Sequence, residues 1–281
     1  MRKYLLILFV IVWAIVLLPK LYRGTCPLFS KSKPIAVKYI QTPKPEQIDA
    51  ADSLPEAFKL LKNREDSQAL DIFDKILLKD PSNQDALWGK AEVLRRSRKY
   101  PESEKILKQT LAVDPNYAPS LISLAYIRYK DDNLNEAKRI IDKALENTCD
   151  DHEDAGLAYM MLGAINSRRA SKSWGLGKII YGTQIKRYFL QAVQLAPNLP
   201  ETHLGLGAFY INAPHFIGGD LDKGIKELFI ALKLAPKFAT VSARLAQVYK
   251  RLGDEKNYRF YLERAETLDP DNEVVKEIKG K

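Results

Sequence analysis

The sequence predicts an all-α protein whose helices form hairpins that stack into a solenoid. Prolines end successive apolar helical runs, and the steps from Pro81 to Pro115 and from Pro236 to Pro270 are both 34 residues. A period of about 20 to 50 residues is typical of stacked supersecondary units. Runs that alternate apolar and polar residues, the pattern of a strand, are missing, and 46% hydrophobic residues supply a continuous core.

The clearest hairpin spans residues 239–270. Its first helix carries Leu245, Ala246 and Tyr249, its turn is Gly253-Asp254, and its second helix carries Leu262 and Ala265 and ends at Pro270. Small residues at such positions let two antiparallel helices approach closely, while the large ones fill the seam. This pattern resembles the tetratricopeptide repeat (TPR) family over about residues 50–270. The resemblance implies a TPR α-solenoid, a right-handed superhelix of helical hairpins that serves as a binding scaffold.

The N-terminal residues 1–22 are predicted to be a single transmembrane helix, or signal anchor. Met1-Arg2-Lys3 precedes an uncharged run from Tyr4 to Pro19. Such a helix, extended to Tyr22, spans about 24–28 Å, which just crosses a bilayer. A cleaved signal peptide and a lipoprotein acylated at Cys26 are alternatives. Charge counting leaves open on which side of the membrane the repeats lie.

Residues 23–50 are expected to form a basic linker that spaces the repeats from the membrane. They contain Pro27, Pro34, Pro43 and Pro45 and little periodicity. The first 50 residues hold eight basic and two acidic residues, which leaves 36 basic and 33 acidic residues for the rest of a chain with net charge +9. Most of the excess charge is therefore local, and general nucleic-acid binding is not expected.

About six repeats are expected within residues 51–270, followed by a C-terminal cap at 271–281. The first two end at Pro81 and Pro115, and in the third Cys149 replaces the closing proline. The fourth resumes the register at Pro197 with about ten extra residues, placed in an inserted loop near 168–178. The fifth carries about five extra residues in the equivalent loop, near 212–219, and the sixth is the hairpin at 239–270.

The TPR resemblance implies that the first helices line a concave groove. The family's groove positions fall on apolar and aromatic residues of this sequence, namely Trp88, Ile122, Tyr126, Tyr129, Met160, Leu204 and Ile211. A groove of this kind suits a peptide with apolar anchors from a protein partner. The alternative is a small hydrophobic ligand, since Ala213-Pro214 and Gly218-Gly219-Asp220 resemble a loop of TPR proteins associated with periplasmic solute transporters.

A second candidate surface is a basic edge on the longer insertion. Residues 155–200 contain six Lys and Arg and no Asp or Glu. The residues expected at this edge are Arg168, Arg169, Lys172, Trp174 and Lys178. Adjacent repeats stack in register, so the two inserted loops should lie side by side. We expect this edge to contact either an anionic lipid surface or an acidic partner.

The sequence contains no constellation that indicates catalysis. No phosphate-binding loop, nucleophile elbow or zinc-protease motif occurs, and His152, His203 and His215 are far apart in the chain. The two cysteines form no metal-binding cluster. The chain is therefore not expected to be an enzyme, to hold a metal or to need a cofactor.

Overall fold

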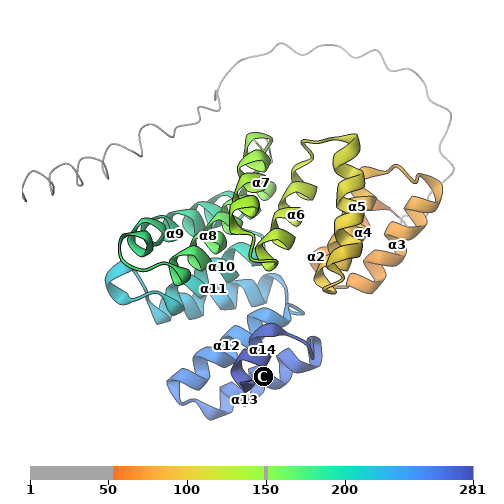
Figure 1. Cartoon of the computed structure of the whole chain (residues 1–281). Coiled ribbons are helices and arrows are strands. Elements are labelled where there is room, and N and C mark those ends of the chain that lie inside the picture. The colour runs from red at the N-terminus through yellow and green to blue at the C-terminus, as the bar shows by residue number, and fades with distance from the viewer. Residues whose placement is uncertain (1–52, 149–150, 281) are drawn as a thin grey trace, which may run out of the picture. The chain divides into compact units, whose positions relative to one another are not determined.

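The computed structural model describes residues 53–148 and 151–280. The predicted membrane anchor and linker, residues 1–22 and 23–50, lie outside these ranges. The described part of the chain is helical, without a strand, as the sequence predicts. Figure 1 shows the hairpins in chain order, from α2 and α3 in orange to α12, α13 and α14 in blue.

The helices form antiparallel pairs that follow one another along the chain. Their bounds are α2 Leu54–Lys62, α3 Asp66–Lys79, α4 Gln84–Arg96, α5 Tyr100–Val113, α6 Ala118–Lys130, α7 Leu134–Glu146, α8 His152–Lys172, α9 Leu176–Leu195, α10 Pro200–Asn212, α11 Leu221–Leu234, α12 Ala239–Leu252, α13 Glu255–Leu268 and α14 Glu273–Lys279. A single 3-10 turn, His215–Ile217, lies between α10 and α11.

The first helices of the hairpins form one layer. Besides its own partner, each of α4, α6, α8 and α10 packs against the first helix of the hairpins before and after it, and second helices make no comparable contact with each other. The first helices are therefore closer together than the second helices. This difference curves the array so that α2, α4, α6, α8, α10 and α12 line its inner face.

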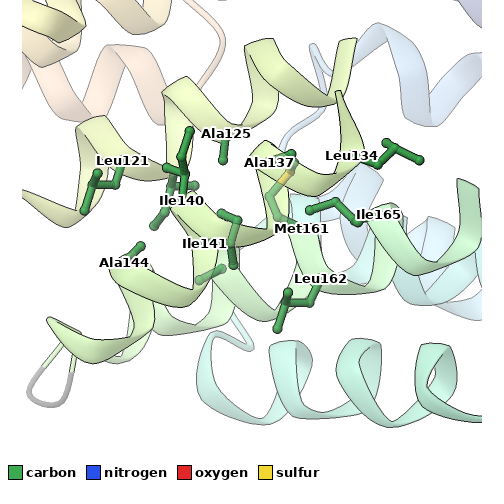
Figure 2. Close-up of a cluster of buried hydrophobic side chains, with 12 residues drawn as sticks. Leu121, Ala125, Leu134, Ala137, Ile140, Ile141, Ala144, Met161, Leu162 and Ile165 are labelled. Atoms are coloured by element: carbon green, nitrogen blue, oxygen red, sulfur yellow. The ribbon is translucent and has the colours of Figure 1, made fainter. Parts of the chain in front are cut away.

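The core runs from hairpin to hairpin through small and large side chains. Figure 2 shows side chains from α6, α7 and α8, among them Ala137 and Ile141, gathered between the three helices. Gly89 on α4 lies against the Phe73 ring, which a Cβ would approach to 2.2 Å. Such pairs hold the helices together because the ring fills the space that the missing side chain leaves.

Polar side chains mark where most of the helices begin. Asn83, Asn133, Asp151, Asp220 and Asp254 each accept a hydrogen bond from a backbone N–H in the first turn of the following helix. Each cap satisfies one of the N–H groups that a helix start leaves unpaired. Across residues 53–148 and 151–280, no helix has both the length and the apolar character needed to span a membrane.

The extra residues near 168–178 do not form the expected inserted loop. They lengthen the two helices instead: α8 has 21 residues and α9 has 20, and residues 173–175 alone separate them. No proline interrupts the sequence between Pro119 and Pro197, and the residues added are mostly compatible with a helix, so continued helical hydrogen bonding is favoured over a loop. Gly175, with φ of 60°, makes the tight turn.

The connection between α10 and α11 is a compact turn over residues 213–220. The backbone N–H of Gly219 donates to the carbonyl of Pro214, and that of Asp220 donates to the carbonyl of Tyr210. A Cβ at Gly219 would lie 1.8 Å from the Ala213 carbonyl oxygen, so the turn requires glycine there. Gly218 adopts the left-handed conformation with φ of 99°.

Candidate functional site

A groove of about 1640 Å³ runs along the inner face of the array. Residues of all six first helices line it, together with the turn between α13 and α14. Six of the seven groove residues expected from the sequence lie in this lining: Trp88, Ile122, Tyr126, Tyr129, Met160 and Leu204. They come from α4, α6, α8 and α10, so the apolar and aromatic lining extends over four consecutive hairpins.

Aromatic contacts fix the shape of the lining near its N-terminal end. The Trp88 ring packs against Phe58 at 5.7 Å between centroids, and its indole N–H donates to the Ser123 hydroxyl at 3.1 Å. Tyr126 and Tyr129 pack together at 6.3 Å. A Trp whose N–H is satisfied and whose ring is braced offers a rigid apolar surface to a ligand.

Ile211 is the expected groove residue that the structure places elsewhere. Its side chain is 4% exposed and packs in the core with Leu228 and Val241 rather than lining the groove. The cause is Gly224 on α11, where a Cβ would lie 2.6 Å from Ile211 Cγ1. The space left by this glycine draws Ile211 into its own hairpin.

A buried carboxylate organises the charged part of the groove. Glu92 accepts hydrogen bonds from Arg95 Nε at 2.7 Å, from Arg96 Nε at 3.0 Å and from the Ser123 hydroxyl at 3.1 Å. Burial by itself would raise the pKa of Glu92, but the two guanidinium groups outweigh it and hold the pKa at about 2. Glu92 is therefore ionised and fixes both arginines on one turn of α4.

Arg64 carries a second cation into the groove from the turn between α2 and α3. Its guanidinium pairs with Glu201 on α10 and lies over the Phe238 ring, 3.8 Å from the centroid. Burial, together with the nearby Arg96, lowers its pKa to about 10, and its Nε has no hydrogen-bond partner. Arg64 thus joins the first hairpin to helices that follow it by more than 130 residues.

Further ion pairs join early and late hairpins. Arg98, between α4 and α5, pairs with Asp269 at 2.6 Å, and Lys130 at the end of α6 pairs with Glu273. Glu65 pairs with Lys237 at 3.3 Å. The turns of the first three hairpins therefore form ion pairs with residues at or just before the starts of later helices, α14 included. These ion pairs close the inner face of the array on one side.

The closing turns use a strained backbone. Arg64, Arg98 and Asp132 have φ of 65°, 61° and 62°, in the left-handed region that non-glycine residues rarely adopt. The same place in the last hairpin is Gly253. Side chains are thus retained at the three turns where they reach another part of the chain.

Arg95 and Arg244 line the middle of the groove, and Arg168 lies beside it against Tyr129. Arg95 lies over the Tyr126 ring at 4.1 Å, and Arg168 lies over the Tyr129 ring at 4.2 Å. Arg244 on α12 donates to Gln247 at 2.8 Å, and burial lowers its pKa. Burial also raises the pKa of Tyr129. The groove therefore combines apolar side chains with arginines whose charges are only partly shielded from water.

The basic edge expected from the sequence divides into two groups. Arg168 donates to the carbonyl of Tyr129, Arg169 to the carbonyl of Leu134, and Lys172 pairs with Asp132. These three cations support the long hairpin on the turn between α6 and α7. Trp174 and Lys178 are exposed at its end.

The titratable groups of the described chain do not gather into a metal site. No group of three or more His, Cys, Asp or Glu residues is placed to hold an ion within residues 53–148 and 151–280. His203 is buried between Glu227, at 2.6 Å from Nδ1, and the carbonyl of Pro197, at 2.9 Å from Nε2. It joins the start of α10 to α11 and lies away from the groove.

The contacts that close the groove could not be found by reading the repeats. Arg64 and Glu201 are 137 residues apart, and Arg98 and Asp269 are 171 apart. The only local signal of these contacts is that a residue other than glycine occupies a turn position where glycine is usual. It marks the turn as unusual but does not name the partner.

Comparisons with known proteins address the fold. Two family models, each described as tetratricopeptide repeat, match residues 60–119 and 239–272. The chain contains tetratricopeptide repeats. Such repeats generally form scaffolds that bind proteins or peptides rather than catalytic domains. No curated protein matches the sequence.

Solved structures resemble the TPR array at low identity. The human IFIT1 dimer with m7Gppp-AAAA is 18% identical, with a TM-score of 0.57 over 81% of this chain and 52% of that chain. The Cut9–Hcn1 structure gives 15% identity and a TM-score of 0.54 over 83% and 43%. Pseudomonas aeruginosa PilF gives 18% identity and 0.46 over 83% and 98%. The chain spans about half the length of the IFIT1 chain, and the likeness concerns the fold alone.

Proposed function

We propose that this TPR array is a scaffold that binds a peptide segment of a protein partner in its groove and is held at a membrane by its N-terminal segment. The observation that carries the proposal is the groove itself. Its apolar and aromatic lining continues over α4, α6, α8 and α10, with arginines beside it. An extended or helical peptide can place successive side chains along such a lining.

The size of the groove favours a peptide over the alternative, a small hydrophobic ligand. Pockets for small molecules have volumes of about 300–1,000 Å³. The groove has about 1640 Å³ and is lined by residues from Pro55 to Val274. A single small molecule would leave much of this lining in contact with water.

Selection from a displayed library of random peptides tests the groove. Tyr126→Ala combined with Met160→Ala removes two side chains of the lining, and Phe260→Ala removes a ring that is 56% exposed on α13, outside the groove. Selected peptides should lose about tenfold or more in affinity with the first variant, as expected for central anchors, and little with the second. The proposal would be contradicted if neither variant changed peptide binding, or if both changed it equally.

The membrane tether needs a separate test because residues 1–22 lie outside the described chain. The full chain should stay in the membrane fraction after alkaline carbonate extraction, whereas a chain that begins at residue 23 should not. Release of the full chain by carbonate would contradict the tether. Protease protection of the repeats in sealed vesicles would then report on which side of the membrane they lie.

A further inference from the structure

The ends of the hairpins differ in chemistry between the two halves of the array. The first three turns carry polar residues, among them Arg64, Arg98 and Asp132, and all three make ion pairs with other parts of the chain. The next two turns along the chain carry exposed apolar side chains instead. Trp174 is 92% exposed between α8 and α9, and Phe216 is 86% exposed between α10 and α11.

The long hairpin projects its end beyond its neighbours. Helix α8 has 21 residues, whereas α6 and α10 on either side have 13 each. Eight residues correspond to about 12 Å of helix. Ile180, in the second turn of α9, is 58% exposed in this overhang, close in sequence to Trp174.

The overhang is held in place, and the next turn packs against it. Arg169 donates to the Leu134 carbonyl, and Lys172 pairs with Asp132, so the base of the overhang is fixed to the preceding hairpin. Tyr181 of α9 and Ala213 pack in one cluster. A Cβ at Gly218 would lie 2.8 Å from Lys186 Nζ, so the turn that bears Phe216 lies against α9. Hereafter the apolar edge means Trp174, Ile180 and Phe216, none of which lines the groove.

The charge around the apolar edge selects its partner. Residues 155–219 contain a single acidic residue, Glu201, which pairs with Arg64 in the groove. Lys178 is exposed within the overhang, and Lys186 lies beside the turn of Phe216. The nearest carboxylates are paired, Asp220 with Lys223 and Asp132 with Lys172. Exposed Trp and Phe beside Lys match the interface of an anionic bilayer, where aromatic rings lie among the headgroups and cations meet phosphates.

We propose that the apolar edge inserts into the interface of an anionic phospholipid membrane and orients the TPR array on it. Trp174 and Phe216 enter the headgroup region, and Lys178 lies at the level of the phosphates. This site differs from the groove and does not depend on the N-terminal segment. It replaces the broader basic edge, because Arg168, Arg169 and Lys172 are engaged with the preceding hairpin.

A site-specific fluorophore on the full chain tests this proposal. In a background with Cys26→Ser and Cys149→Ser, Ile180→Cys places a polarity-sensitive label at the apolar edge. The matched control is Leu78→Cys on α3, a side chain that is 85% exposed on another hairpin. The proteins are mixed with phosphatidylcholine vesicles, with and without phosphatidylglycerol, that carry a nitroxide on the acyl chains. Any contribution of the N-terminal segment is common to both labelled chains.

The label at 180 should shift to the blue and be quenched severalfold more than the label at 78 on vesicles with phosphatidylglycerol. Salt should reduce the difference, and Lys178→Gln should weaken the association of the edge about fivefold. Trp174→Ser with Phe216→Ser should bring the quenching at 180 down to that at 78. Equal quenching at the two sites, or a signal at 180 that ignores phosphatidylglycerol, would overturn the proposal and leave the peptide-binding groove untouched.

Discussion

Replacing Arg64 with glycine separates the strain of its turn from the contact that its side chain makes. The substitution relieves a left-handed backbone conformation. This relief stabilises the fold by about 1 kcal/mol after the greater chain entropy of glycine is subtracted. It also removes the guanidinium from the Phe238 ring, at about 2 kcal/mol for a desolvated pair. Glu201 loses its partner, and because its side chain keeps 23% of its surface exposed we take about 2 kcal/mol. The free energy of unfolding should fall by about 3 kcal/mol.

Arg98→Gly is the matched control for this prediction. Arg98 has nearly the same φ, but its pair with Asp269 is between side chains that are 35% and 28% exposed, which contributes at most about 0.5 kcal/mol. Arg98→Gly should therefore be neutral or slightly stabilising. Urea unfolding followed by circular dichroism measures both variants. If Arg64→Gly has the stability of Arg98→Gly, the contact with Glu201 and Phe238 does not hold the array closed and the reasoning fails.

Three further predictions concern the groove and the core. Glu92→Gln should lower the free energy of unfolding by several kcal/mol above about pH 5. The difference from wild type should shrink as the pH falls toward 2, because Glu92, whose pKa is low in the folded state, stabilises the fold only while its carboxyl is ionised. Urea unfolding at several pH values measures this difference, and a constant difference would contradict the prediction. Burial, with Asp151 and Glu153 nearby, raises the pKa of Asp154 to about 7. Asp154→Asn should therefore stabilise the protein by about 1–2 kcal/mol at pH 8, where the wild-type carboxyl is ionised, and hardly at pH 4. No gain in stability at pH 8 would refute this prediction. Gly89→Ala should lower the thermal midpoint, because its Cβ meets the Phe73 ring and destabilises the protein by about 2 kcal/mol net. Gly182→Ala has open space around it and should stabilise the protein by up to about 1 kcal/mol. Equal effects of the two substitutions would contradict the role of packing at Gly89.

The helical hairpins could be predicted because their signals are local. Small and large residues such as Ala246, Tyr249 and Ala265 lie within one repeat, and prolines recur one repeat later at a step of 34. The seven groove positions are those that the TPR resemblance implies once the repeats are in register, and six of them lie in the lining of the groove. The prediction for Ile211 was wrong because the register specifies which helix face a residue lies on, but not the space that Gly224 leaves beside Ile211.

The insertion at 168–178 was misplaced for a different reason. The register counts how many residues are added to a repeat but does not say whether they form a loop or lengthen the helices. Two neighbours decide this: α7 and α10 support α8 and α9 over their common length, and Arg169 and Lys172 hold the extension on the preceding turn. The charge pattern of residues 155–200 was visible in the sequence, but its division into supporting cations and an exposed end was not.

The sequence by itself determined the repeat, its length and the absence of acidic residues along one stretch, and the TPR resemblance implied which helix layer faces inward. Each of these is a property of residues within about one repeat of each other, where chain connectivity fixes the neighbours. Only the tertiary structure decided which turns meet across the superhelix, as Arg64 meets Glu201 and Phe238. That pairing depends on the summed rotation of several hairpins, so small differences in packing along the way determine which side chains come together.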